Sequence, residues 1–272
     1  MKPIIDVSRA AKERAYTICV LLLAFLWNQL SFQGARIVCD LLSFFRGIPL
    51  WRYQDFTSSV DLAIPVLPWT IVIYLGTFLF WTVCLFFGSL QPREKSDRLF
   101  CAGFISKVIS FLFFVILPTT YVRPEIQGTG LFDFALRLVY RIDRGDNLFP
   151  SIHCSASWLC WVWMRGRKEI PLKYRLAAFV CAVLICISTL TTKQHVFVDT
   201  ISGIAVAEAS WFFAGLEPLR AWYGRFVDGL IAWAGGTWKP RRNDLQKSPR
   251  GAEPLEDDGE SHSSSPESNK FV

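Results

Sequence analysis

Charged residues are scarce in this chain. Only 19% of its 272 residues are Asp, Glu, Lys or Arg, against about 25% in soluble domains, whereas 52% are hydrophobic and 15% are aromatic. The mean hydropathy is positive, at +0.31, and the apolar residues are grouped in long blocks. This composition excludes an ordinary soluble domain and predicts a protein that is integral to a membrane.

Other features are missing as well, and each absence removes a class of protein. The eight cysteines form no Cys-x-x-Cys pair and no Cys/His ligand spacing, which argues against a zinc site or a disulfide framework. No small-x-small site follows the first apolar run, so we expect no cleavable signal peptide. The net charge is +6, but the positive residues flank apolar segments instead of forming one basic face. Nucleic acid is therefore not an expected partner.

A membrane-spanning helix needs about 20 mostly apolar residues, and six stretches of the chain approach that length. They are residues 16–32, 66–90, 99–118, 150–164, 174–191 and 196–215. The fourth is short, so either it begins before Pro150 or protein shields its outer end. We predict an all-α, polytopic six-helix bundle within residues 1–238. Residues 239–272 are polar and lack apolar periodicity, which predicts a disordered tail.

Two further apolar stretches lie outside these segments. Residues 37–45, between the first and second segments, predict a short interfacial or re-entrant helix. After the sixth segment, apolar residues recur at helical spacing from Leu219 to Trp233. That stripe fits a helix on the membrane surface and equally a continuation of the sixth segment.

The distribution of charge predicts an orientation. Excess Lys and Arg in short loops marks the cytoplasmic side. In a six-span arrangement the positive excess of the N-terminal segment, of residues 91–98 and of residues 165–175 falls on one side. Residues 33–65 and 119–147, whose charges balance, fall on the other side. We therefore expect cytoplasmic N- and C-termini, with both histidine motifs described below at the extracytoplasmic face.

Only three histidines are present, and two of them stand at the starts of apolar segments. His195 is followed four residues later by Asp199, a spacing that places both side chains on one face of a helix. A carboxylate fixes the tautomer of an imidazole and favours its charged form, so His195 is a candidate nucleophile. His153 is a candidate general acid. Each histidine alone also fits a structural role, but a carboxylate within an apolar run is costly and usually functional.

A phosphate site is expected beside these histidines. Pro150 suits the first turn of a helix, and the free N–H groups of that turn, with the Ser151 hydroxyl, would bind an anion. Arg123 can hold phosphate oxygens with two N–H groups, although it also fits a solvated loop charge. The chemistry that these residues suggest needs no metal and no cofactor.

Together these motifs resemble the type 2 phosphatidic acid phosphatase superfamily. The resemblance covers residues 99–215 and consists of Arg123-Pro124, of Pro-Ser-x-His ending at His153, and of His195 with Asp199. It implies a metal-independent membrane enzyme that hydrolyses or transfers the phosphate of a lipid through a phosphohistidine. It also implies His195 as nucleophile, Asp199 as its orienting partner and His153 as general acid, with Arg123 and Ser151 as phosphate ligands.

The chain departs from the fullest form of that pattern. The family has a lysine where this chain has Ile116, and Ser-Arg where it has Ser188-Thr189, so two phosphate-binding cations are missing. With these losses, the chain is similar to a divergent branch of the family that includes sphingomyelin and inositol phosphorylceramide synthases, which exchange a head group between lipids. Lys193, two residues before His195, is our candidate for a replacement cation.

The residues leave more than one function open. The first is a lipid phosphatase acting at the extracytoplasmic leaflet, and a head-group phosphotransferase differs from it only in the acceptor. A lipid-binding protein without activity is a different class, motivated by the missing cations. A proton-coupled transporter using the His195–Asp199 pair ranks last, because polar residues deep in the spans are scarce. The sequence leaves the lipid and the oligomeric state unknown.

Overall fold

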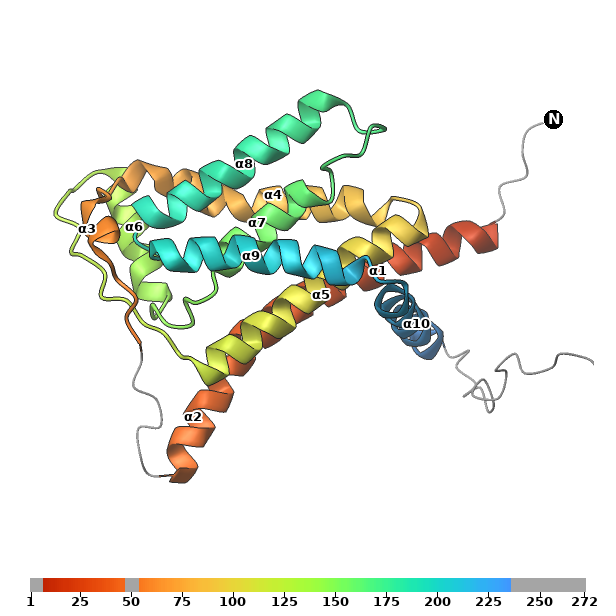
Figure 1. Cartoon of the computed structure of the whole chain (residues 1–272), viewed down its shortest axis with the longest axis horizontal. Helices are drawn as coiled ribbons and strands as arrows, with labels where there is room; N and C mark the ends of the chain where they lie inside the picture. The colour runs from red at the N-terminus through yellow and green to blue at the C-terminus, as the bar shows by residue number, and fades with distance from the viewer. Residues whose placement is uncertain (1–6, 47–53, 236–272) are drawn as a thin grey trace, which may run out of the picture. The chain divides into compact units, whose positions relative to one another are not determined.

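The protein is helical throughout the part that the structure, a computed structural model, describes, which is residues 7–46 and 54–235. These ranges hold no β-strand, only two isolated β-bridges, so the predicted all-α class is confirmed. Figure 1 labels most of the helices along the chain. They are α1 (Val7–Gln29), α2 (Ala35–Arg46), α3 (Ser59–Ala63), α4 (Ile71–Ser89), α5 (Arg93–Ile116), α6 (Leu131–Ile142), α7 (Ile152–Val162), α8 (Leu172–Thr191), α9 (Phe197–Ala214) and α10 (Glu217–Ala234), with a π-helical turn η1 (Leu30–Gly34) and a 3₁₀ turn η2 (Pro68–Thr70).

Five helices, not six, are long and apolar enough to cross a membrane among the described residues. They are Ala11–Leu42, Pro68–Ser89, Arg93–Ile116, Leu172–Thr191 and Phe197–Ala214. The fourth predicted span is the exception, because α7 has only 11 residues and is about 16 Å long, roughly half of the hydrocarbon thickness of a bilayer. An integral, multi-pass membrane protein is supported, with the predicted count of six corrected by one.

The short α7 is shielded by protein. It does not begin before Pro150, since Ser151 is its N-cap and accepts a hydrogen bond from the backbone N–H of Cys154. It packs against α4, α5, α8 and α9, and most of its side chains are buried. Of the two explanations open at the sequence level, shielding by neighbouring helices is therefore the one that holds.

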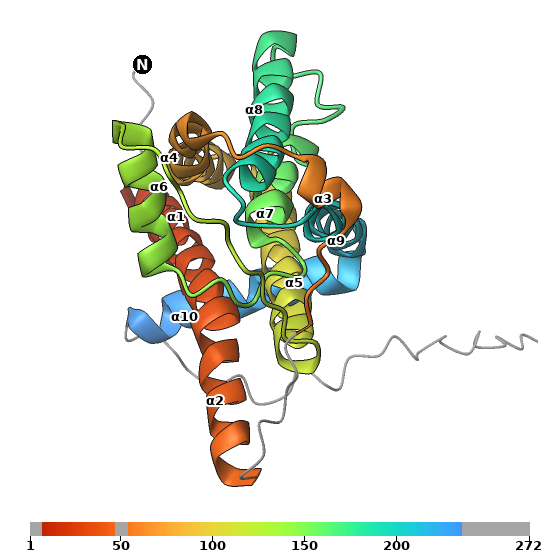
Figure 2. The ribbon, with the colours of Figure 1, turned by 90° about the vertical axis from the view of Figure 1, so that its left-hand side faces the viewer.

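The first helix runs on without a loop into the segment that was predicted to be a separate interfacial helix. η1 joins α1 to α2 with helical backbone at both junctions, and Figure 2 shows α2 continuing the line of α1. The helix predicted over residues 37–45 is thus present, but as the last part of a long bulged helix. A π-turn inserts one extra residue in a helix and often occurs at functional sites.

The connecting segments collect at two opposite ends of the bundle (Figure 1). At one end, ion pairs join Arg93 to Asp228 and Arg165 to Glu208. At the other end, the backbone N–H of Leu67 donates to the carbonyl of Thr191. The loops with excess positive charge therefore lie opposite the segments in which charges balance. Which end faces the cytoplasm stays a prediction.

The helix after the last span changes direction. The chain turns at Gly215 and Leu216, and Figures 1 and 2 show α10 running across the axes of α1 and α5. Its buried face is Tyr223, Gly224 and Val227, packed on α1 and α5. A simple continuation of the sixth span is therefore wrong. The predicted disordered tail, residues 239–272, lies outside the described residues.

Candidate active site

Both candidate histidines lie in one pocket at the end of the bundle opposite the basic loops. His153 is in the first turn of α7 and His195 precedes α9, and their ring centroids are 5.7 Å apart. A cavity of about 280 Å³ opens beside them and is lined by residues of α1, η1, α2, α4, α6 and the loops before α7 and α9. The fold therefore brings together two histidines that are more than 40 positions apart in the sequence.

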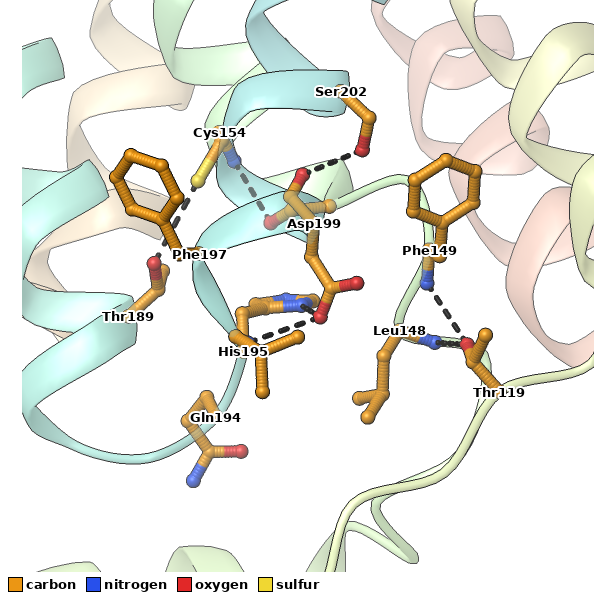
Figure 3. Close-up of polar contacts among 12 residues, drawn as sticks. Thr119, Leu148, Phe149, Cys154, Thr189, Gln194, His195, Phe197, Asp199 and Ser202 are labelled. Atoms are coloured by element: carbon orange, nitrogen blue, oxygen red, sulfur yellow. Dashed lines mark hydrogen bonds and ion pairs between the residues drawn. The ribbon is translucent and has the colours of Figure 1, made fainter. Parts of the chain in front are cut away.

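The loop before α7 is held by a threonine that the sequence analysis did not select. The hydroxyl of Thr119 accepts hydrogen bonds from the backbone N–H groups of Leu148 and Phe149, at 2.9 and 3.0 Å, as Figure 3 shows. Asn147 lies in the left-handed region, at φ 56°, and its amide donates to the carbonyl of Phe32. Together these bonds fix the point at which α7 begins and so the position of His153.

Pro150 and Ser151 have different places from those predicted. Pro150 precedes the N-cap and is not within the first helical turn, because Ser151 is the N-cap and α7 begins at Ile152. The Ser151 hydroxyl is occupied by the N–H of Cys154 at 3.3 Å, while its own N–H donates to the carbonyl of Asp199. Ser151 thus fastens α7 to α9, and it is not among the residues that line the cavity.

Aromatic rings surround His153. Tyr74 and Trp81 of α4 lie at 4.7 and 5.6 Å between ring centroids, and Phe78 lies at 6.3 Å. These contacts with three rings of one helix limit the movement of the imidazole, whose centroid lies 5.7 Å from that of His195. Among the described residues, no hydrogen bond to the His153 ring is seen, so its nitrogens are available to a ligand.

Asp199 contacts His195 for a reason other than the one predicted. His195 is not helical, because α9 begins at Phe197. Instead, the Asp199 carboxylate reaches back over the helix start (Figure 3), where Oδ2 accepts from the N–H of Val196 at 3.1 Å and lies 3.4 Å from Nδ1 of His195. The other oxygen, Oδ1, is buried without a hydrogen-bond partner among the described residues. Asp199 therefore caps the helix and also directs Nε2 of His195 toward the pocket.

The loop that carries His195 is tied down at both ends. The carbonyl of Thr189 accepts from the N–H groups of Gln194 and His195, at 2.9 and 3.2 Å. Asp61 of α3, which the sequence analysis did not select, accepts from the N–H of Phe197 at 2.6 Å. Burial raises the pKa of Asp61, but hydrogen bonds from Ser58 and Phe197 and the charge of Lys193 outweigh burial, so the net shift is downward.

Lys193 does not reach the pocket. Its backbone is in the left-handed region, at φ 53°, and its ammonium group donates to the carbonyls of Asp61 and Ile64 at 2.6 and 2.7 Å. Lys193 is buried but is absent from the cavity lining. The structure thus places this predicted phosphate ligand where it binds carbonyls at the C-terminal end of α3.

Arg123 acts on the pocket through a neighbouring amide. Its guanidinium donates to both the carbonyl and the carboxylate of Asp143, at 2.8 and 2.6 Å, and to Oε1 of Gln194 at 2.6 Å. Because the oxygen of Gln194 faces a donor, its NH₂ group must point the other way. That NH₂ is buried without a partner among the described residues, and Gln194 lines the cavity.

Arg36 is another residue that the sequence analysis missed. It lies on α2 and lines the cavity, and it stacks on the Phe32 ring at 4.1 Å. Its Nε donates to Asp146 at 2.7 Å and its Nη2 to Asp143 at 3.1 Å. Burial raises the pKa of Asp143, but the two guanidinium groups outweigh burial and hold the pKa below its usual value. The signal available in the sequence was a positive charge in the segment after the first span.

Of the six predicted site residues, the structure brings His153, His195 and Asp199 together. Arg123 adjoins the pocket through Gln194, whereas Ser151 and Lys193 point elsewhere. The residues that stand in place of the two missing cations supply no replacement donor to the pocket. Ile116 is apolar and 67% exposed, and the Thr189 hydroxyl donates to the carbonyl of Cys186 in its own helix. Within the described residues, no cluster of His, Cys, Asp and Glu has a metal-binding arrangement.

A comparison with known families bears on this pocket. Residues 98–217 match the model of the PAP2 superfamily, a stretch that includes α7, α8 and α9 but less than half of the 272 residues. No curated protein and no solved structure gives a significant match. The matched segment contains His153, His195 and Asp199, and the match supports a relationship of this segment to the PAP2 superfamily.

Proposed function

We propose that this protein is a membrane enzyme of the PAP2 superfamily that cleaves or transfers the phosphate group of a lipid, with His195 as nucleophile. One observation carries the proposal: two imidazoles face one pocket, 5.7 Å apart between ring centroids, with a buried carboxylate behind one of them. Nucleophilic attack needs about 3–3.5 Å between the reacting atoms, and proton transfer needs about 2.6–3.2 Å. Phosphorus held in the adjoining cavity of about 280 Å³ would be within reach of both rings.

The reaction divides into two steps. Nε2 of His195 attacks phosphorus, a P–N bond forms, and the P–O bond to the lipid breaks. The departing alkoxide takes a proton from His153, while Nδ1–H of His195 stays hydrogen-bonded to Asp199, which favours the positive charge on the ring. Water or a lipid alcohol then attacks phosphorus, gives its proton to His153 and releases His195.

Two donors replace the cations that the pattern lacks. The Gln194 NH₂ group has no partner among the described residues, and Gln194 lines the cavity. Arg36 uses Nε and Nη2 for carboxylates, while Nη1 has only a 3.5 Å contact to Gln33. A guanidinium has five N–H donors, so Nη1 remains available to a phosphate oxygen.

The test is to trap the covalent intermediate. Purified protein is mixed with phosphatidic acid labelled on phosphorus and quenched in alkali, in which phosphohistidine persists. We expect label on the native chain, none on His195→Ala, and normal labelling on His262→Ala, which changes the third histidine. Absence of label on the native chain, together with no turnover of any lipid phosphate, would overturn the proposal in favour of a non-catalytic lipid-binding protein.

The acceptor is identified by the products. Free phosphate from phosphatidic acid indicates hydrolysis. A new phospholipid formed from a phospholipid plus diacylglycerol, without free phosphate, indicates head-group transfer. Both outcomes require His195, so the same His195→Ala variant is the control in each assay.

A further inference from the structure

A second cavity adjoins the histidine pocket and is almost entirely apolar. It has a volume of about 520 Å³ and lies between α1, α4, α5 and α7, helices that pack on one another in this region. Its lining is mainly Leu, Phe, Trp and Ala. Four residues line both cavities, namely Asn28, Gln29, Phe78 and Trp81. A ligand with a polar head and a hydrocarbon chain can therefore occupy the two cavities together.

One charged residue interrupts this apolar lining. Lys107 of α5 is the only Asp, Glu, Lys or Arg among the residues that line the cavity. Its Nζ atom is buried and has no hydrogen-bond partner among the described residues, and it lies 5.9 Å from the Trp81 ring centroid. An amine without a partner in an apolar, membrane-embedded site is costly, which points to a ligand that supplies an acceptor.

The position of Lys107 limits where that acceptor lies. Trp81 lies close to both groups, since its ring centroid is 5.6 Å from that of His153 and 5.9 Å from Nζ of Lys107. Nζ and the imidazole that faces the phosphate are therefore neighbours of the same indole ring. The acceptor must lie within a few bonds of the phosphorus, at the junction between head group and chain.

We propose that the apolar cavity holds the hydrocarbon chain of the substrate and that Lys107 donates a hydrogen bond to an ester or amide carbonyl at the start of that chain. The inference rests on the proposed function, which places phosphorus between His153 and His195. It assigns the substrate class: an acylated lipid phosphate, whose carbonyls lie close to phosphorus, is selected over a prenyl phosphate or an ether lipid, which has no carbonyl there.

The experiment compares two lipids that differ only in that carbonyl. Dioleoyl phosphatidic acid and its dioleyl ether analogue are assayed with the native protein, with Lys107→Met, which keeps length and removes the donor, and with Lys173→Met, an exposed lysine at the start of α8. We expect Lys107→Met to lower kcat/KM for the ester lipid about tenfold and to leave the ether lipid unchanged. Lys173→Met should change neither.

Binding is measured separately from turnover. In a His195→Ala background, quenching of tryptophan fluorescence by brominated acyl chains reports occupancy of the cavity that Trp81 lines. We expect tighter binding of the ester lipid, with the preference lost in the double variant with Lys107→Met. Equal losses on both lipids, or no loss on either, would overturn the inference. Lipid binding with this preference but without phosphohistidine would overturn only the proposed function.

Discussion

At the scale of single residues, the pocket depends on which atom of each side chain is already engaged. Gln194 shows this most clearly, since it is 2% exposed and its oxygen is held by Arg123 while its NH₂ has no partner among the described residues. Arg123 donates from Nη1 and Nη2 to Asp143 and Gln194, and it is not among the residues that line the cavity. The arginine that the sequence suggests as a ligand therefore positions another donor.

Gln194→Glu tests this arrangement with almost no change in shape. A carboxylate keeps the bond to Arg123 but presents an acceptor to the phosphate where the amide presents a donor. We expect kcat/KM to fall about 10- to 100-fold, since a hydrogen bond to a charged group contributes about 1.5–3 kcal/mol. The thermal unfolding midpoint should not fall. An unfolding midpoint that drops in step with activity would instead indicate a structural glutamine.

Arg36→Gln tests the second donor. Loss of the guanidinium should raise KM for a lipid phosphate about tenfold or more, because a charged donor beside the phosphate is removed. Arg141 of α6 is the control, since it is exposed and does not line the cavity. Equal KM values for Arg36→Gln and Arg141→Gln, measured over the same lipid series, would exclude Arg36 from phosphate binding.

Lys193→Met separates stability from binding. The ammonium group donates two hydrogen bonds to carbonyls at 2.6 and 2.7 Å, so we expect a loss of about 1.5–3 kcal/mol in the free energy of unfolding with KM unchanged. Unfolding in detergent and steady-state kinetics check the two quantities, with the exposed Lys168→Met as control. A raised KM at unchanged stability would return Lys193 to the phosphate site.

At the scale of helices, the separation of the two histidines depends on how closely α7 approaches α9. Gly203 of α9 makes that approach possible, because a Cβ there would lie 2.6 Å from the carbonyl of Ser151 and 3.0 Å from Cβ of Cys154. The Ser151–Asp199 backbone bond joins the same two helices. The 11 residues of α7 thus carry His153 on a helix held by its neighbours.

Gly203→Ala should force these helices apart. We expect a loss of about 1–3 kcal/mol from overpacking and a fall in kcat of about 100-fold, since a misplacement of about 1 Å at a reacting group has an effect of that size. Gly76→Ala on α4 is the control, because a Cβ there meets nothing within 4 Å. That variant should keep activity and gain up to about 1 kcal/mol in stability. Full activity of Gly203→Ala would contradict the role assigned to this contact.

At the scale of the whole molecule, the pocket and the loops with excess Lys and Arg lie at opposite ends of the helical bundle. At one end, Arg165 pairs with Glu208 and Arg93 pairs with Asp228, whereas the histidines lie at the other end. The lining of the pocket includes residues of α1, α2 and α4, which precede the segment that matches the PAP2 superfamily. The pocket therefore needs helices from outside that segment.

The orientation of the two ends is testable by thiol labelling. We expect an impermeant reagent applied to intact cells to label Thr129→Cys, in the segment whose charges balance, and to label Lys168→Cys only after permeabilisation, because the loops with excess Lys and Arg should be cytoplasmic. Both positions are exposed, and the parent chain measures the background from the native cysteines. The reverse pattern would place the pocket at the cytoplasmic face.

The sequence by itself determined the helical, membrane-embedded class, because blocks of apolar residues long enough to span a bilayer have few other stable forms. It also selected His153, His195 and Asp199, because only three histidines are present and a carboxylate within an apolar run is costly. Only the tertiary structure decided that Asp199 meets His195 by capping α9, that Lys193 turns away, and that Gln194, Arg36 and Lys107 face the cavities. These outcomes depend on which backbone carbonyl or carboxylate takes each donor, and those partners come from segments far away in the chain.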